Sequence, residues 1–452
     1  MKVIFITPAS DLCRSVLYRM GSTFYGKKNC ITGPLILGHI LKEAGHDVSV
    51  YEELYENIDY SRIMGADVYC LYTMTSNAPR AYLIADRLRA ETGARIIIGG
   101  MHATVMPEEA AMHADQVVTG EAETVIIDVV EGRIIDKIVK AKCLQDLDDA
   151  PYPDYSLLKT RCECANVMTT RGCPFRCSFC STSRMFHPYR ERSIENVINE
   201  LRYYKKLGFQ YVNFQDDNFT ANKKRAKEIC RRMIEEDLIF KETFFFGRTD
   251  MADDEELLYL LQQAHLTRVL VGFESLNPAS LEMVNKHQNV SDIKKCAETL
   301  SRYQIKLIVS LVLGIDSDGK EDINRSVKFA RDINAYQFQP AILTPFPGTA
   351  DYEKYENESR IISKDWSLYN MGNVTFIPKK LTPWELQKQF VKAASQFYSF
   401  LSSFKIWKIF GANYGIRRLG MWLIVKLAIP AVHFVATFLK GTYLYKLKHN
   451  FA

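Results

Sequence analysis

The chain has 452 residues, of which 47% are hydrophobic and 25% charged, and its formal net charge is +5. This composition excludes a disordered or fibrous chain, and the weak net charge leads us to expect no nucleic-acid partner. The length predicts two or three domains. The opening segment, Met1–Ile6, is too short for a secretory signal and is typical of a buried strand. We therefore expect a cytoplasmic protein, in which clustered cysteines more often bind metal or do redox chemistry than form disulfides.

Short apolar runs alternate with helical stretches over residues 1 to about 125. The alternation predicts a doubly wound, Rossmann-like parallel sheet over residues 1–135, whose ligands bind at the carboxyl ends of the strands. The expected strands are Val3–Thr7, Val48–Tyr51, Val68–Leu71, Arg95–Ile98 and Gln116–Val118, and the expected helices are Leu35–Ala44 and Ala81–Thr92. Candidate binding residues at or just after the strand ends are Thr73, Thr75, Ser76, Gly99, Gly100, His102, Thr104, Gly120 and Glu121.

A second series of strands and helices follows a linker predicted at residues 136–160, and it occupies residues 161–350. Six strand–helix units predict a partial (βα)6 TIM-like barrel, with its chemistry at the carboxyl ends of the strands. The expected strands are Asn166–Thr170, Tyr211–Gln215, Thr243–Gly247, Arg268–Phe273, Leu307–Leu313 and Gln337–Leu343. The expected helices include Ile194–Lys206, Arg225–Glu236, Ser280–Asn285 and Ile293–Tyr303.

Three cysteines follow the first barrel strand at C-x3-C-x2-C spacing: Cys173, Cys177 and Cys180. Thiolates suit iron–sulfur clusters, and a short loop can bring three of them to three corners of one [4Fe–4S] cube. Three ligands leave one iron open to bind a substrate. The alternatives are three loop cysteines without a metal, or a zinc site with His187 as fourth ligand. Cys162 and Cys164 form a weaker pair that we interpret as incidental.

The cysteine loop, with Phe179 before its last cysteine, resembles the signature of the radical S-adenosylmethionine (SAM) superfamily, and the resemblance covers roughly residues 165–345. It implies that the open iron chelates the amino and carboxylate groups of SAM. It also implies that one electron from the reduced cluster cleaves SAM to a 5′-deoxyadenosyl radical. An external one-electron reductant of the flavodoxin or ferredoxin type is therefore expected. The resemblance gives as candidate SAM-binding residues Phe179, Asp216, Asp217, Arg248, Glu274 and Ser310.

The chemistry of these side chains leaves alternatives open. Carboxylates suit the methionine amine and the ribose hydroxyls. One of Asp216 and Asp217 could instead cap the turn that starts at Asn218. Arg248 could bind the methionine carboxylate or form a salt bridge at the barrel mouth.

The first 125 residues resemble the cobalamin-binding domain that precedes the barrel in one large radical SAM subfamily. The matching segments are Thr73–Arg80, Gly99–Thr104, Pro107–Glu109 and Gly120–Glu123. The Asp-x-His-x-x-Gly signature of an axial histidine is missing, as it generally is in that subfamily. His102 is therefore expected near the corrin edge and not on cobalt. A degenerate domain that no longer binds cobalamin is the alternative.

Residues 351–452 are predicted to be helical, with a basic tail. Thr382-Pro383-Trp384-Glu385 is typical of a capped helix start. From Leu401 to Ala452 there are eight Lys or Arg residues and no Asp or Glu. Two interpretations stay open: a segment that contacts anionic lipid as a peripheral membrane anchor on the inner face, or a helical cap on the barrel with a basic solvated face. A membrane span is disfavoured because Lys426 interrupts the apolar stretch.

The resemblances together predict an enzyme that uses a [4Fe–4S] cluster, SAM and cobalamin to methylate an unactivated carbon of an apolar small molecule, such as a lipid, an isoprenoid or a tetrapyrrole. The alternatives are a radical cyclase or oxidoreductase of the same architecture that does not methylate, and a cluster-based sensor without turnover.

Overall fold

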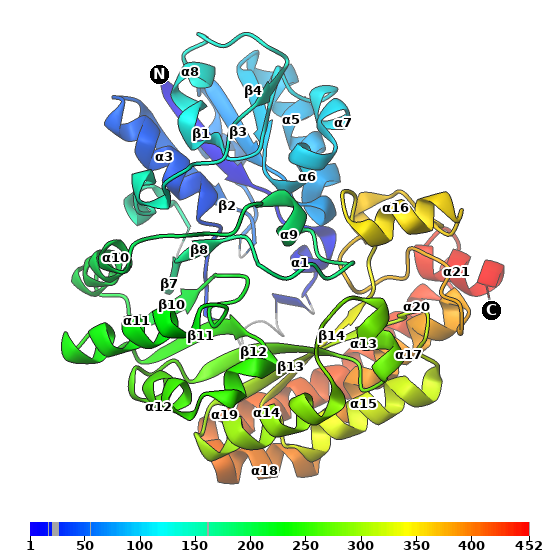
Figure 1. Cartoon of the computed structure of the whole chain (residues 1–452). Coiled ribbons are helices and arrows are strands. Elements are labelled where there is room, and N and C mark those ends of the chain that lie inside the picture. Colours follow the sequence, from blue (N-terminus) through cyan, green and yellow to red (C-terminus); the bar gives the residue numbers. More distant parts are fainter. Residues whose placement is uncertain (17, 20–26, 55, 161, 452) are drawn as a thin grey trace.

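The computed structural model describes residues 1–451 apart from 17, 20–26, 55 and 161. Two α/β domains follow each other along the chain, and the carboxyl-terminal helices pack on the second domain, some on the side away from the first domain and the last at its flank (Figure 1). The fold class predicted from the sequence is confirmed.

The first domain is a six-stranded parallel sheet in the order β2-β1-β3-β4-β5-β6. The strands are β1 Lys2–Thr7, β2 Asp47–Glu52, β3 Val68–Tyr72, β4 Arg95–Gly99, β5 Gln116–Thr119 and β6 Ile138–Lys140. All five predicted strands are present. The sixth, β6, pairs with β5 within the segment expected to be a linker.

Helices cover both faces of this sheet because successive strand residues point to opposite sides. Ile4 and Ile6 of β1 pack in one core with α5, whereas Val3 and Phe5 pack in the other with α3. The helices are α1 Asp11–Arg14, α3 Gly33–Glu43, α4 Tyr60–Ile63, α5 Ala78–Thr92, α6 Met101–Val105, α7 Pro107–Ala111 and α8 Ile126–Val130.

The second domain is a parallel sheet in the order β14-β13-β12-β11-β10-β7, curved into an open barrel whose end strands do not pair. The strands are β7 Cys164–Val167, β10 Tyr211–Phe214, β11 Glu242–Gly247, β12 Arg268–Glu274, β13 Lys306–Leu313 and β14 Gln337–Ile342. The helices that cover them are α10 Ile194–Lys206, α11 Lys223–Glu235, α12 Glu255–Gln263, α13 Pro278–Met283, α14 Val290–Arg302, α15 Lys320–Asp332 and α16 Ala350–Asn357. The six predicted strands and the four predicted helices are present.

The loop that contains the three cysteines lies between β8 (Thr170–Arg171) and α9 (Thr182–Met185). β8 pairs with β9 (Arg190–Glu191) in a small antiparallel hairpin, so both ends of the loop are anchored. The sequence predicted one strand through Thr170. The structure ends β7 at Val167 and starts the hairpin three residues later.

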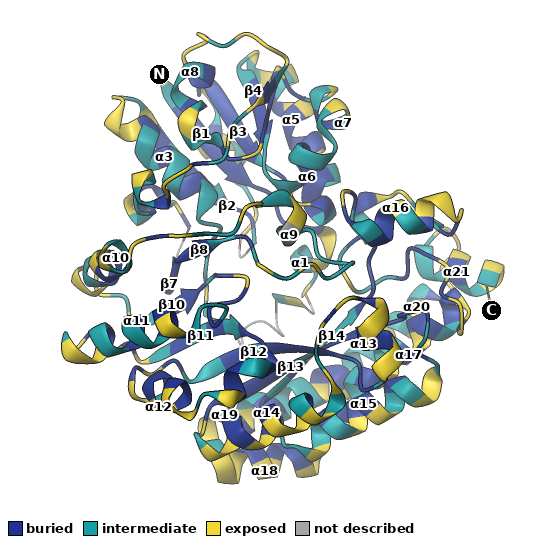
Figure 2. Ribbon diagram, in the orientation of Figure 1, coloured by how far each residue is buried: buried dark blue, intermediate teal, exposed yellow. Residues whose placement is uncertain are grey.

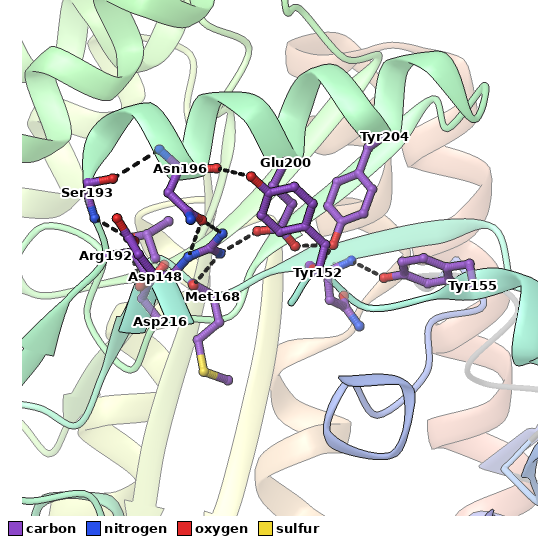
Figure 3. Close-up of polar contacts among 12 residues, drawn as sticks. Asp148, Tyr152, Tyr155, Met168, Arg192, Ser193, Asn196, Glu200, Tyr204 and Asp216 are labelled. Carbon is purple, nitrogen blue, oxygen red and sulfur yellow. Dashed lines mark hydrogen bonds and ion pairs between the residues drawn. The ribbon is translucent and has the colours of Figure 1, made fainter. Parts of the chain in front are cut away.

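A buried polar network joins the connector between the domains to the barrel (Figure 3). Arg192 forms an ion pair with Glu200 and donates to the carbonyl of Met168 at 3.1 Å. The connector contributes Tyr152, whose hydroxyl donates to the carbonyl of Asn196 at 3.1 Å, and Asp148, which accepts from the amide of Ser193 at 2.9 Å. These contacts fix the segment that carries the chain from one domain to the next.

The carboxyl-terminal region is helical, as predicted: α17 Pro383–Phe397, α18 Phe400–Phe410, α19 Ala412–Leu423, α20 Ile429–Ala436 and α21 Tyr443–Phe451. The predicted capping box is present, because Thr382 Oγ1 accepts from the amide of Glu385 at 3.2 Å and the Glu385 carboxylate accepts from the amide of Thr382 at 2.9 Å. One helix among the described residues, Ala412–Ala436, is long and apolar enough to cross a membrane by length and composition.

Candidate functional site

A pocket of about 430 Å³ lies between the two domains, within the range of roughly 300–1,000 Å³ that is usual for ligand sites. The first domain contributes the carboxyl ends of β3, β4 and β5 together with the start of α3. The second domain contributes residues on either side of the cysteine loop. Five of the predicted binding residues of the first domain line this pocket: Gly99, Gly100, Thr104, Gly120 and Glu121.

Two glycines let the backbone form the floor of the pocket. Gly100 has a φ of +100°, and a Cβ there would lie 2.6 Å from the carbonyl oxygen of Thr73. Gly120 has a φ of +80°, and a Cβ there would lie 2.7 Å from the carbonyl oxygen of Ala141. Residues with a side chain rarely adopt these positive φ angles, and a Cβ would also clash at both positions, so glycine is required at each. The resulting apolar cradle fits a large flat ligand that approaches the strand ends closely.

Four other predicted residues of the first domain do not line the pocket. Thr73 is fully buried, and its hydroxyl donates to the carbonyl of Gly99 at 2.8 Å and accepts from the amide of Ala103 at 3.1 Å. It holds the β4–α6 turn in place. Thr75 lies 3.3 Å from His102 Nδ1, and Ser76 follows it in a short helical turn.

His102 is fully buried on the far side of the turn from the pocket lining. Its Nε2 lies 3.5 Å from the Glu109 carboxylate, and its ring meets the Trp366 indole edge-on at 5.4 Å. Glu109 in turn accepts from Trp366 Nε1 at 2.9 Å. Burial lowers the pKa of His102. The structure places His102 between the first domain and the segment that follows α16, outside the pocket lining, and its place near a corrin edge stays a prediction.

Glu121 lines the pocket, but its carboxylate is engaged by the second domain. It lies 3.0 Å from Arg171 and also pairs with Arg190, and it accepts from the amide of Leu144 at 2.9 Å. Although burial alone would raise the pKa of this carboxyl, the two guanidinium groups bring the pKa below its usual value. Glu121 therefore connects the two domains by ion pairs at the wall of the pocket.

The three cysteines have free, half-buried thiols. Burial raises the pKa of Cys173 to about 11 and also raises the pKa of Cys177, although Lys286 and Arg248 oppose the shift at Cys177. No group of three or more His, Cys, Asp or Glu side chains in the described part of the chain could hold a single metal ion. A cluster takes each thiolate on a different iron, so the donor set of this loop fits an iron–sulfur cube and its open fourth corner.

Arg248, after β11, anchors this loop. Its guanidinium lies 3.8 Å from the centre of the Phe175 ring and donates to the carbonyl of Lys286. Among the described residues Arg248 forms no salt bridge, and its binding of the methionine carboxylate stays a prediction. Phe179 packs its ring against the barrel core.

Glu274 ends β12 in a left-handed conformation, with a φ of +60°. Its carboxylate lies 2.7 Å from Lys286 Nζ, beside the cysteine loop. Ser310 lies half-buried on the next strand, β13, at the level of Gly272. Both therefore lie on neighbouring strands of the barrel, as predicted, but outside the lining of the interdomain pocket.

Asp216 and Asp217 follow β10 and diverge. Asp216 is fully buried and accepts from the hydroxyls of Thr169 at 2.9 Å and Thr170 at 2.6 Å, while its Oδ2 has no partner among the described residues. A buried acceptor of this kind is typical of a site that a ligand completes. Asp217 lines the pocket and reaches solvent through it, and desolvation raises its pKa to about 6. The helix that follows, α11, is capped by Asn222 and by neither aspartate.

Sequence reasoning missed several residues of the pocket. The start of α3 contributes an apolar wall, and its Gly33-Pro34 pair was the one signal available, since proline favours the first turn of a helix. Tyr72, Arg171 and Gln215 were also missed, although they lie at predicted strand ends or next to the cysteine loop. Other missed residues come from segments that no pattern connects to the site, among them Ile126, Met168, Met185 and Phe186.

A second group of thiols also escaped the sequence analysis. Cys30, at the pocket, lies 3.8 Å from Cys162 measured between the sulfur atoms. The two residues are far apart in the sequence, so spacing could not pair them.

Comparison with known proteins identifies both domains. Residues 167–330 match the Radical SAM superfamily, and residues 32–130 match the B12 binding domain. The chain therefore contains a radical SAM domain and a B12-binding domain. It is 29% identical to bacteriochlorophyllide d C-12(1)-methyltransferase of Chlorobaculum tepidum over 80% of this chain and 82% of the relative. It is 28% identical to the C-8(2)-methyltransferase of the same organism, over 78% and 82%.

The same arrangement of domains is found in a solved structure. The radical SAM methyltransferase TsrM of Kitasatospora setae, solved with cobalamin and a [4Fe–4S] cluster, superposes with a TM-score of 0.67 at 14% identity, over 95% of this chain and 99% of TsrM. At this identity the likeness concerns the fold. The matches to the Radical SAM and B12-binding family models support the predicted cofactors, a [4Fe–4S] cluster, SAM and cobalamin.

Proposed function

We propose that this radical SAM enzyme methylates an unactivated carbon of an apolar small molecule in a cobalamin-dependent reaction. The observation that carries the proposal is a pocket that both domains line. The carboxyl ends of β4 and β5 form one wall, and Gly172, the residue before the first cysteine, lies on the other. Bringing reactants together in one site is itself a large part of catalysis.

The cofactors, when bound, supply a radical generator and a methyl carrier; the chain supplies their positions. In the proposal, Cys173, Cys177 and Cys180 hold the cluster, and the buried Asp216 Oδ2 and the pocket carboxylate of Asp217 accept from the methionine amine. The raised pKa of Asp217 favours this assignment, because a cationic partner would restore its charged form. Gly99, Gly100, Thr104 and Gly120 form the corrin cradle.

A tetrapyrrole is the substrate class that the proposal favours. The two relatives described above act on bacteriochlorophyllide d by name, and each covers most of this chain. The pocket lining is mainly aliphatic and aromatic, which suits a large apolar reactant more than a charged metabolite. An external flavodoxin or ferredoxin as reductant and a cytoplasmic location are part of the same proposal.

The test begins with anaerobic reconstitution of the full chain with iron, sulfide and hydroxocobalamin, followed by gel filtration. Retained corrin and cluster are read from the visible absorption. We then expect SAM, a one-electron reductant and a bacteriochlorophyllide-type tetrapyrrole to give 5′-deoxyadenosine, S-adenosylhomocysteine and a product larger by one methylene. Cys177→Ser should lose the cluster absorption and all three products but keep the corrin. Cys143→Ser changes a half-buried cysteine outside the loop, and this variant should keep both the cluster and the corrin.

The alternatives give different results. If 5′-deoxyadenosine forms without S-adenosylhomocysteine or a methylated product, the enzyme is a radical cyclase or oxidoreductase and the methyl-transfer proposal fails. If neither nucleoside forms although both cofactors are bound, the chain is a sensor. Retention of the cluster without corrin would mean that the first domain has lost its ligand.

A further inference from the structure

The carboxyl-terminal helices α18 and α19 cover the end of the barrel opposite the cysteine loop. Arg418 of α19 is fully buried and donates to the carbonyls of Ala335 at 2.6 Å and Tyr336 at 2.7 Å, the two residues just before β14. The Tyr414 hydroxyl donates to Glu242, the first residue of β11, at 3.3 Å. These contacts lie at the amino ends of the strands. The cysteine loop and the pocket lie at the other end.

The outer face of these helices is apolar and exposed, and we name it the cap face. Nearly half of all exposed large apolar side chains in the described residues lie within residues 400–439. They stand on α18, on α19, on α20 and just after it, and they are Phe400, Leu401, Phe404, Trp407, Ile409, Ile416, Leu423, Leu427, Val432, Phe434, Val435, Phe438 and Leu439. Figure 2 shows the exposed outer side of α18 at the edge of the molecule. Exposed patches of this extent mark a surface with a partner.

The charges around the cap face indicate which partner. Residues 401–452 contain Lys and Arg but no Asp or Glu. Lys405 and Lys408 are exposed on α18 beside Phe404 and Trp407, and Lys426 is exposed beside Leu427. An apolar strip interleaved with cations and free of carboxylates complements an anionic lipid surface, where acyl chains take the apolar groups and headgroups take the lysines.

The buried side chains on the inner face of these helices oppose a membrane-spanning arrangement. The stretch Ala412–Ala436 is long enough to cross a bilayer, but Arg418, Ile424 and Val425 on its inner face are buried against the protein. To span, the helix would have to leave the barrel and carry the Arg418 guanidinium into hydrocarbon, which is very costly. Its middle, Ile424–Ala428, is a π-helical turn just before Pro430, which lacks the amide that would bond to Lys426. The helix is therefore held flat against the barrel.

We propose that the cap face docks on an anionic membrane surface, with α18 and the Ala412–Ala436 helix lying in the interface. The strand axes of the barrel then point away from the lipid, and the pocket faces the aqueous side. This proposal goes beyond the reaction and is independent of it, because binding needs only the folded chain.

Co-sedimentation with large unilamellar vesicles tests the docking. The reconstituted full chain should bind vesicles of phosphatidylcholine and phosphatidylglycerol, bind pure phosphatidylcholine about tenfold more weakly, and lose much of the binding at high salt. Leu427→Glu and Phe404→Glu should each weaken binding about tenfold or more, because each removes apolar burial and adds a repelled charge. Trp407 should be quenched by brominated acyl chains in the bound state.

Leu83→Glu is the matched control, since Leu83 is an equally exposed leucine on α5 of the first domain, 65% exposed against 67% for Leu427. It should bind vesicles as the unchanged chain does. Circular dichroism and retained corrin establish that all variants are folded. Failure of the unchanged chain to bind anionic vesicles, or equal binding by Leu427→Glu, overturns the proposal. A dimer by light scattering that Leu427→Glu converts to monomer, without vesicle binding, assigns the cap face to a second copy and overturns it too.

Discussion

Glu52 shows how strongly burial acts on a single side chain near the pocket. It ends β2, is 4% exposed, and accepts from the amide of Ile31 at 3.3 Å. Desolvation outweighs this hydrogen bond and raises the pKa to about 8. The folded protein thus binds a proton here that the unfolded chain releases at much lower pH. Stability is therefore lost as pH rises from about 4.5 through about 8.

Glu52→Gln removes this titration, and we expect it to stabilise the protein at pH 8.5 by an amount on the order of 1–3 kcal/mol and to change little at pH 5. Thermal unfolding at the two pH values measures the difference. Glu56→Gln, which changes an exposed carboxyl in the loop after β2, should change Tm little at both pH values. A Glu52→Gln protein with the same Tm gain at pH 5 and pH 8.5 would contradict the assignment.

The residues themselves could be predicted only in part. The sequence identified which side chains follow strands, because strand periodicity is readable. It could not tell which way they point. Thr73 and His102 follow β3 and β4 as predicted, yet one bonds the turn and the other packs against Trp366, a contact between residues far apart in the chain.

The turn between β4 and α6 decides the shape of the pocket. Gly100→Ala places a methyl group against the Thr73 backbone in a left-handed conformation. We expect this change to cost about 2–4 kcal/mol and to abolish corrin retention. Gly93→Ala is the matched variant, since Gly93 also has a positive φ, +66°, but nothing lies within 4 Å of its Cβ position. It should cost only about 1 kcal/mol and keep the corrin. Urea unfolding measures the loss of stability, and visible absorption measures the retained corrin. Equal losses of stability and of corrin in the two variants would refute the role of Gly100 in corrin binding.

Long elements were predictable and short ones were not. The eleven predicted strands and the Thr382 capping box are present because each has a local signal. Strand β6 has three residues and β8 and β9 have two each, too few for a period to show. Their pairing is decided by the chain around them.

At the scale of the whole molecule, Glu121 joins the two domains. Glu121→Gln removes the carboxylate partner of the half-buried Arg190 and one of the two carboxylates of Arg171, which keeps Glu123 at 2.6 Å. We expect a loss of about 3 kcal/mol and faster proteolysis of the connector. Because the pKa of Glu121 is lowered, the contribution is present at neutral pH and disappears as the carboxylate protonates in acid. Glu108→Gln, at an exposed carboxylate of α7, should change neither readout. Unchanged proteolysis of the Glu121→Gln protein would contradict the conclusion that Glu121 holds the two domains together.

The placement of the domains on each other was beyond sequence reasoning. Motifs predicted each domain separately. They identified the cysteine loop and the strand ends but not their positions relative to each other. The pocket exists only where Gly120 and Asp217 face a common space, and no periodic signal links residues so distant in the chain.

The cap on the barrel is made from a part of the chain that is synthesised after the barrel itself. Until Tyr414 and Arg418 have left the ribosome, Glu242 lacks its hydroxyl partner and the start of β14 lacks the guanidinium that binds its carbonyls. During synthesis, the amino ends of the barrel strands therefore stay uncovered after the carboxyl ends, which carry the cysteine loop, have already been made. A ribosome-bound intermediate of this kind would need chaperone protection at those amino ends, and premature termination after α17 would yield a barrel in which they stay uncovered.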